Sequence, residues 1–299
     1  MTEPAGGSSP RGGSAPAADL RAALRGIRAL VLDADGVLVM RGAALPGVRE
    51  ALAALDERGI PYRVATNISA LHRETLAARF ARMGLSIPAG RIVTALSATA
   101  EDTRRTYPGR PVFVITRPDG LREFGDQPLL AHEDADADDA RVAAVIFGDG
   151  AEDLSYANLD RAFRLVRRGA ALIAMHRNGW WYTARGETID TGAFVAAVEY
   201  ATGVRARVTG KPAPLMFRTA FRGLAADLAA AGGPRLRRDE VAMVGDHAPQ
   251  DIGGAHRAGL RGILVLTGRT TAGEVPGLRG AEAPDAVAEV LGEVVAALD

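Results

Sequence analysis

Two acidic pairs in this sequence each follow a short apolar run. Asp33 and Asp35 come after residues 27–32 (IRALVL), and Asp246 and Asp251 come after residues 241–244 (VAMV). Short apolar runs of this kind are typical of buried strands. Carboxylates gathered at strand ends raise one another's pKa unless a cation lies among them. Oxygen ligands in this number favour a hard octahedral ion, so we expect a Mg²⁺ site.

Polar residues of a different kind follow two further apolar runs. Thr66 and Asn67 come after residues 62–65 (YRVA), and Lys211 lies in the TGKP segment that follows residues 206–208 (ARV). In open parallel sheets, ligands bind beyond the carboxyl ends of the strands. We therefore expect the four polar segments to meet at such a sheet edge.

Each segment has a simpler explanation when it is taken alone. The DADG sequence at 33–36 could form a turn, and Thr66 or Asp246 could cap the helix that follows. The calcium loop of helix-loop-helix proteins is excluded, because it needs glycine at its sixth position and Gly36 is at the fourth. The four segments in this order, each at a predicted strand end, are together highly specific.

Lys211 is the only lysine among the 36 basic residues of the chain. The arginine bias by itself carries no function. Lysine is a compact point charge on a thin stem, whereas the guanidinium of arginine is a broad planar fork. A cramped site beside a carboxylate or phosphate would require lysine, so we expect Lys211 to lie in such a site.

Strand and helix patterns alternate in the first and last thirds of the chain. Residues 48–55 and 217–228 carry apolar side chains at helical spacing, and this alternation predicts a parallel, doubly wound sheet. The middle of the chain has strand and helix patterns of its own. The predicted fold class is α/β, with a Rossmann-like core at 20–96 and 204–299, an inserted α/β cap domain at 97–203 and a disordered tail at 1–19.

The composition excludes several classes of protein. Acidic and basic residues balance at 36 each, so no global field attracts nucleic acid or an anionic membrane. No apolar run approaches the roughly 20 residues that span a bilayer. The absence of cysteine excludes disulfides, thiolate zinc sites and cysteine nucleophiles. We expect a cytoplasmic protein with a small-molecule substrate and no nucleic-acid or membrane partner.

The four segments resemble the motifs of the haloacid dehalogenase-like superfamily of aspartyl-nucleophile phosphatases. DADGVL at 33–38 is similar to the first motif, Thr66 to the second, Lys211 to the third and GDHAPQD at 245–251 to the fourth. The insertion resembles the larger α/β cap of the nitrophenylphosphatase-like and phosphoglycolate phosphatase-like group. Residues 171–214 are especially similar to the branch of phospholysine phosphohistidine inorganic pyrophosphate phosphatases.

The resemblance implies a role for each matched residue. Asp33 would attack phosphorus and form an aspartyl-phosphate. Asp35 would protonate the leaving oxygen and later deprotonate the attacking water. Lys211 would neutralise charge between Asp33 and the phosphoryl group. Thr66 and Asn67 would hold phosphate oxygens.

The resemblance also implies which residues bind Mg²⁺. Asp33 would contribute its carboxylate and Asp35 its backbone carbonyl. Asp246 would bind the metal directly, and Asp251 directly or through a metal-bound water. We expect the neighbouring His247 to lie near the metal without ligating it.

Residues of the predicted cap carry further expectations. Arg177 ends a cap strand, and we hypothesise that it contacts a substrate anion. Trp180 and Trp181 are adjacent in a strand and face opposite sides, so we expect both to pack in a hairpin. The acidic segment at 132–139 is predicted to be a solvated loop. The Gly-Asp pair at 148–149 lacks the second acid of the fourth motif, so we expect no metal there.

The combined expectation is a Mg²⁺-dependent phosphatase of a small metabolite, either a phosphate monoester, pyrophosphate or a phosphoramidate. Two alternatives stay open: a phosphotransferase that passes the aspartyl phosphate to an alcohol, and a catalytically silent regulatory or binding protein on the same fold. The cap would close over the site and exclude bulk water. By resemblance alone, we expect a homodimer formed through the cap.

Overall fold

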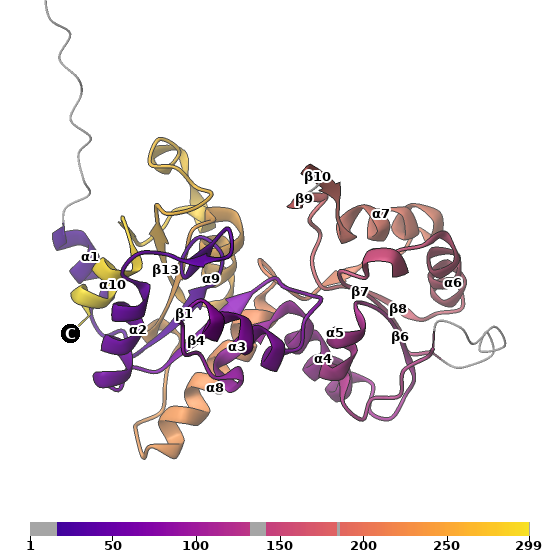
Figure 1. Ribbon diagram of the computed structural model, residues 1–299, viewed down its shortest axis with the longest axis horizontal. Helices are drawn as coiled ribbons and strands as arrows, with labels where there is room; N and C mark the ends of the chain where they lie inside the picture. The colour runs from indigo at the N-terminus through magenta and orange to yellow at the C-terminus, as the bar shows by residue number, and fades with distance from the viewer. Residues whose placement is uncertain (1–16, 132–141, 184–185, 299) are drawn as a thin grey trace, which may run out of the picture.

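The chain forms two lobes in the structure, a computed structural model (Figure 1). The structure describes residues 17–131, 142–183 and 186–298. The first lobe contains helix α1 (Ala17–Leu24) near the start of the chain and helix α10 (Leu291–Ala297) near its end. The second lobe is built from the middle of the chain, so it is an insertion into the first.

Six parallel strands form the sheet of the first lobe. Their spatial order is β14 (Ala286–Ala288), β13 (Arg261–Val265), β12 (Val241–Gly245), β1 (Ala29–Asp33), β4 (Tyr62–Thr66) and β5 (Ile92–Thr94). In the centre, Leu32 of β1 is in register with Val244 on one side and Val64 on the other. Because neighbouring strands run in the same direction, the carboxyl ends of β12, β1 and β4 lie side by side at one edge.

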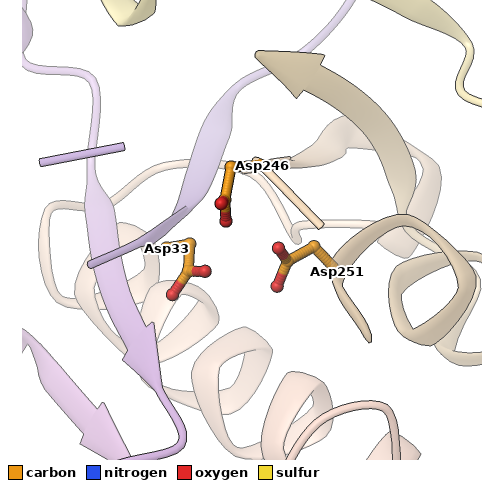
Figure 2. Close-up of side chains that lie close together, drawn as sticks. All are labelled: Asp33, Asp246 and Asp251. Carbon is orange, nitrogen blue, oxygen red and sulfur yellow. The ribbon is translucent and has the colours of Figure 1, made fainter. Parts of the chain in front are cut away.

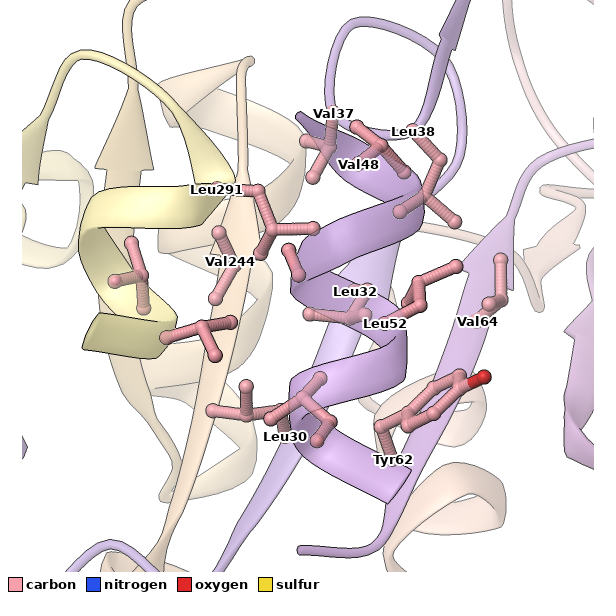
Figure 3. Packing of buried hydrophobic residues seen from close by; sticks show 14 of the residues in the cluster. Leu30, Leu32, Val37, Leu38, Val48, Leu52, Tyr62, Val64, Val244 and Leu291 are labelled. Atoms are coloured by element: carbon pink, nitrogen blue, oxygen red, sulfur yellow. The ribbon is translucent and has the colours of Figure 1, made fainter. Parts of the chain in front are cut away.

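Helices cover both faces of this sheet, because alternate side chains of each strand point to opposite sides. Leu30 and Leu32 belong to a core formed with α1, α2 (Val48–Glu57), α3 (Arg73–Arg82) and α10 (Figure 3). Ala29 and Val31 face the other side, against α8 (Pro214–Ala230) and α9 (Gly253–Ala258). Burial of each leucine side chain stabilises the fold by about 1.5–3 kcal/mol, so β1 is fixed from both faces.

A smaller parallel sheet lies at the centre of the second lobe, the cap. Its order is β11 (Arg207–Val208), β8 (Ala171–Ala174), β7 (Ala144–Phe147) and β6 (Val112–Ile115). One face packs on α6 (Tyr156–Arg167) and α7 (Thr191–Thr202), and the other on α4 (Ala95–Thr106). A parallel-sheet core with a separate α/β cap confirms the predicted fold class.

The remaining elements are short. Strands β2 (Val39–Met40) and β3 (Ala43–Ala44) form a hairpin soon after β1, and β9 (Trp180–Thr183) and β10 (Gly186–Ile189) form another in the cap. Helix α5 (Pro118–Leu121) lies in the cap, and the π-helical turn η6 (Ala248–Ile252) leads into α9. No helix among the described residues is both long and apolar enough to cross a bilayer.

Three elements of the structure lie at or across the predicted boundaries. The predicted core, which resumes at 204, includes the strand expected at 206–208, whereas β11 pairs with β8 of the cap sheet. The predicted cap start at 97 falls inside α4, which packs on the cores of both lobes. The predicted tail overlaps α1, which begins at Ala17. Residues 1–16 and the loop predicted at 132–139 lie outside the described residues.

Candidate active site

Asp33 is the last residue of β1, at the edge where the central strands end. Its side chain is buried and accepts a hydrogen bond from the backbone N–H of Ala34 at 2.6 Å. Burial, reinforced by the carboxylate of Asp251, raises the pKa of Asp33 well above its usual range, and the charge of Lys211 opposes this shift. This carboxyl therefore depends on neighbouring positive charge to ionise.

Lys211 supplies that charge from the loop after β11. Its Nζ lies 2.6 Å from Asp33 Oδ1 and 2.7 Å from Asp251 Oδ1, and the residue is only 4% exposed. Burial lowers the pKa of Lys211, but the carboxylates of Asp251 and Asp33 outweigh burial and raise it above the ordinary lysine value. The ammonium thus stays charged and joins the two carboxylates.

Asp33, Asp246 and Asp251 form a cluster of buried carboxylates that point toward one another (Figure 2). The oxygen atoms they offer lie within 4.8 Å of one another. Burial, together with the charge of Asp251, raises the pKa of Asp246. Three ionised carboxylates beside one ammonium leave two negative charges in excess. An all-oxygen donor set with this charge fits Mg²⁺.

Two glycines let neighbouring loops approach Asp246. Its Oδ2 accepts the backbone N–H of Arg269 at 2.8 Å. A Cβ atom on Gly268 would lie 1.9 Å from this oxygen, and a Cβ on Gly36 would lie 2.4 Å from it. Gly36 also has a φ of +82°, a conformation that glycine adopts without strain. The position of Asp246 therefore depends on glycine at both sites.

Asp35 lies two residues beyond β1 and is exposed, in contrast to Asp33. Partial desolvation of the carboxyl raises the pKa of Asp35, while the charges of Lys211 and Arg269 oppose the shift. A raised pKa favours the protonated carboxyl, which is the form that can donate a proton. The two aspartates of the DADG segment thus differ in environment, as separate roles in a reaction require.

Thr66 is the last residue of β4 and Asn67 follows it, but the Asn67 side chain already forms hydrogen bonds within the protein. It accepts the backbone N–H of Lys211 at 2.7 Å and donates to the Lys211 carbonyl at 3.0 Å. Its amide thus positions the lysine, and in this arrangement it is not free to hold a phosphate oxygen. Thr66 is buried, and its hydroxyl accepts the backbone N–H of Ile68 at 3.4 Å.

His247 lies next to Asp246 but outside the carboxylate cluster. Its backbone N–H donates to Asp251 Oδ2 at 3.0 Å. Its Nδ1 is buried and has no hydrogen-bond partner in the part of the chain that the structure describes. The residue therefore helps to orient Asp251 through its main chain.

The cap residues singled out in the sequence have different surroundings. Arg177 forms a bidentate ion pair with Glu199, in which Nη1 lies 2.9 Å from Oε1 and Nη2 lies 2.8 Å from Oε2. It also lines a cavity between the cap and the core. Trp180 and Trp181 are in the β9–β10 hairpin but are 56% and 42% exposed, so the packing expected there covers only part of each ring. Asp149 pairs with Arg117 and is not in the carboxylate cluster.

Sequence reasoning missed the segment after β13. This segment contains Gly268, Arg269 and the buried Thr270. The backbone N–H of Thr270 donates to the Asp246 carbonyl at 2.9 Å, and its hydroxyl accepts a hydrogen bond from the backbone N–H of Ala248 at 3.0 Å. The signal was available, because the segment follows the apolar run GILVL at 262–266, and the ends of such strands carry ligand-binding residues. Gln250, whose amide accepts a hydrogen bond from Asn67 at 3.3 Å, was also missed, and no spacing marks it.

Comparison with known proteins agrees with this geometry. The family profile described as haloacid dehalogenase-like hydrolase matches residues 30–127, and a second profile of HAD-like hydrolases matches residues 208–294. The chain therefore belongs to the haloacid dehalogenase-like hydrolase family, as the resemblance of its motifs predicted.

Named relatives cover most of the chain. It is similar to human haloacid dehalogenase-like hydrolase domain-containing protein 2, with 32% identity over 85% of this chain and 89% of the relative. It is 30% identical to rat phospholysine phosphohistidine inorganic pyrophosphate phosphatase over 84% of this chain and 87% of that one. Among solved structures, 4-nitrophenylphosphatase from Thermotoga maritima superposes with a TM-score of 0.78 at 28% identity, covering 93% of this chain and 99% of that chain.

Proposed function

We propose that this chain is a Mg²⁺-dependent phosphatase that hydrolyses a small phosphorylated metabolite through an aspartyl-phosphate on Asp33. The observation that carries the proposal is the position of Lys211 Nζ, which lies 2.6 Å from Asp33 and 2.7 Å from Asp251. Phosphoryl transfer depends mainly on positioning and on neutralising charge, and this ammonium faces the attacking carboxylate. Relatives named as phosphatases support the same type of reaction.

In the first step, the Asp33 carboxylate oxygen attacks phosphorus, and the bond between phosphorus and the leaving oxygen breaks. Asp35 in its protonated form gives its proton to that leaving oxygen. The raised pKa of Asp35 supports this role. Lys211 stabilises the charge that develops on the phosphoryl oxygens.

In the second step, a water molecule attacks the phosphorus of the aspartyl phosphate. Asp35, now a carboxylate, takes a proton from this water. The bond between phosphorus and the Asp33 oxygen breaks, which releases phosphate and restores the Asp33 carboxylate. The Asn67 side chain holds the main-chain N–H and carbonyl of Lys211, which supports an ammonium that faces Asp33 in both steps.

The metal-binding residues we propose are Asp33, Asp246, Asp251 and the backbone carbonyl of Asp35. Mg²⁺ bound there would supply positive charge that neutralises the phosphoryl oxygens and favours ionised carboxylates. The buried Thr66 hydroxyl is our proposed phosphate contact on β4. For Asn67 we propose the positioning of Lys211, which its two bonds support. The cytoplasmic location stays a prediction.

The test is phosphate release from a panel of metabolite phosphates, pyrophosphate and a phosphoramidate, with Mg²⁺ and with EDTA. We expect turnover with Mg²⁺ and its loss in EDTA. Glycerol as a competing acceptor separates a hydrolase from a phosphotransferase, because the latter would form glycerol phosphate at the expense of free phosphate. Absence of turnover on every substrate would instead favour the silent binding protein.

A further inference from the structure

A cavity of about 440 Å³ lies between the cap and the core, next to the catalytic cluster. Arg177 and Asn178 line it from the cap, and Lys211, Gln250 and Arg257 line it from the core. The other four lining residues are valine, alanine and two prolines, so part of the wall is apolar. The volume is within the range of small-molecule sites, about 300–1,000 Å³.

The charged residues that line this cavity are all cationic. Of its nine lining residues, three are cationic and none is acidic. The Lys211 ammonium is already paired with Asp33 and Asp251. The two arginines are therefore the cations that this wall offers to a ligand.

Glu199 holds the Arg177 guanidinium in place. The two oxygens of Glu199, a side chain only 4% exposed, accept hydrogen bonds from Arg177 Nη1 and Nη2 at 2.9 and 2.8 Å. Glu199 also pairs with Arg205 at 3.5 Å, so the group of three has one positive charge in excess. The Arg177 side chain itself remains 40% exposed. A guanidinium has five N–H donors, so this one is oriented and still has donors for a ligand.

Arg257 faces the same cavity from α9, six residues after Asp251. It is exposed, and its Nη2 donates to the Pro249 carbonyl at 3.4 Å. Within the described part of the chain it forms no ion pair with a carboxylate. Its charge is thus uncompensated, in contrast to that of Arg177.

Amide groups connect the two walls of the cavity to the catalytic lysine. Gln250 Nε2 donates to Asn178 Oδ1 of the cap at 3.4 Å, and Gln250 Oε1 accepts from Asn67 at 3.3 Å. Asn67 in turn holds both main-chain groups of Lys211. A ligand in the cavity would therefore contact Lys211 itself and Gln250, which is linked through Asn67 to the loop that carries Lys211.

We propose that this cavity is the leaving-group subsite and that it takes a leaving group with a second anion, a carboxylate or phosphate, on a small apolar body. The anion lies between the guanidinium groups of Arg177 and Arg257, which form charge-assisted hydrogen bonds with it. The apolar wall contacts the body of the leaving group. This inference rests on the proposed phosphatase function and specifies the substrate class.

The test compares 4-carboxyphenyl phosphate with its carboxylate methyl ester, which has the same ring but lacks the second anion. The methyl ester is the better leaving group, so intrinsic reactivity favours the opposite order. We expect kcat/KM with Mg²⁺ to be at least about tenfold higher for the carboxylate. In Arg257→Gln this ratio should fall toward one, and Arg257→Lys should retain part of it.

Arg257 is chosen because it forms no ion pair with a carboxylate among the described residues, whereas Arg177→Gln would remove the nearer of the two arginines that pair with the buried Glu199. Arg21→Gln on α1, in the lobe opposite the cap, is the matched control and should keep the parent ratio (Figure 1). Equal kcat/KM for both esters in the parent, or an unchanged ratio in Arg257→Gln, would overturn the subsite while the phosphatase function stands. If neither ester nor p-nitrophenyl phosphate is hydrolysed, the proposed function fails and the subsite with it.

Discussion

At the scale of single residues, the lysine of this chain has a position that arginine cannot fill. The Nζ atom lies within 2.7 Å of two carboxylates, Asp33 and Asp251, and the residue is 4% exposed. The guanidinium is wider than the ammonium and places its charge farther from the stem. We therefore expect the site to need both the charge of Lys211 and its small size.

We predict that Lys211→Arg lowers kcat/KM for p-nitrophenyl phosphate by about 10²–10³-fold, because the larger group displaces Asp33 or Asp251. Steady-state kinetics with saturating Mg²⁺ measure this, and circular dichroism checks that the variant is folded. Arg21→Lys is the control for an exchange of the same two residue types at an exposed helix position. Near-normal rates would show that charge alone is needed.

Gly268 is a second residue whose size affects the geometry of the site, because it lies against Asp246. A methyl group there would lie 1.9 Å from Asp246 Oδ2, so Gly268→Ala must move this proposed metal ligand. We predict that the Mg²⁺ concentration for half-maximal activity rises by about 10–100-fold, as when groups that orient a metal ligand are altered. Gly273→Ala, with nothing within 4 Å of its added carbon, is the control. An unchanged Mg²⁺ requirement in Gly268→Ala would separate Asp246 from metal binding.

At the scale of elements, the sequence predicts the strand ends well because the signal is local. Apolar runs beside polar residues mark β1, β4 and β12, and the parallel arrangement brings Asp33, Asp246 and Asp251 together. The sheet to which a strand belongs is not a local property. β11 carries the same pattern but pairs with β8 of the cap, so Lys211 reaches the core site from a cap strand.

The hydrogen bonds of Asn67 are a second feature that could not be predicted from the sequence. Its position after β4 is predictable, but its two bonds to Lys211 span 144 residues and depend on how the loops meet. The segment after β13 was predictable in principle, since it follows a strand end. It contributes backbone N–H groups and glycines, which carry no chemical signal of their own in a sequence.

Helix α9, which follows Asp251, is tied to the sheet by His256. Its Nε2 lies 2.9 Å from Asp285 Oδ2 and its Nδ1 lies 2.7 Å from the Ala281 carbonyl. Both partners accept, so the charged imidazole satisfies both. The hydrogen bond to Asp285 raises the pKa of His256, and the same bond lowers the pKa of Asp285.

The direction of the resulting pH dependence follows from these shifts. A raised histidine pKa contributes stability that is complete below its unfolded value of about 6.5 and is lost as pH rises through the folded value. The lowered pKa of Asp285 contributes stability that is present above about pH 3.8 and is lost as pH falls through the folded-state pKa. The ion pair therefore stabilises the fold most between about pH 3.8 and about pH 6.5.

We predict that His256→Gln removes this dependence. Asp285 is 41% exposed at its side chain, so screening limits the pair to about 0.5–1 kcal/mol. Between pH 5.5 and 8.5 the parent Tm should fall by about 1–3 °C more than that of the variant. Differential scanning calorimetry at the two pH values measures this. Parallel changes in Tm for the two proteins would contradict the assignment of the charge to His256.

At the scale of the whole molecule, the hairpin β9–β10 gives the cap an apolar surface. Trp180 and Ile189 are 56% and 59% exposed and lie opposite each other in the ladder, so they share one face of the hairpin, while Trp181, 42% exposed, points to the other face. Exposed apolar side chains that lie together, as Trp180 and Ile189 do, are typical of interaction surfaces. A homodimer through the cap, expected from the family resemblance, would cover such a surface.

We predict a mass of twice the 31.2 kDa chain in size-exclusion chromatography with light scattering. Ile189→Glu should shift the equilibrium toward the monomer, because the new charge would have to be buried in the contact. Val290→Glu, at a 39% exposed position of the core lobe, is the control and should keep the parent mass. A monomeric parent at micromolar concentration would contradict the predicted dimer.

The central claim is that Asp33 is the attacking carboxylate, and Asp33→Asn tests it most directly. The amide has nearly the shape of the carboxylate but cannot form the aspartyl phosphate. With Mg²⁺ and p-nitrophenyl phosphate, the account predicts a fall in kcat of roughly 10⁴-fold or more in a protein that unfolds as cooperatively as the parent. Asp126→Asn, an exposed acid of the cap, should keep parent activity. Retained turnover in Asp33→Asn would contradict the account.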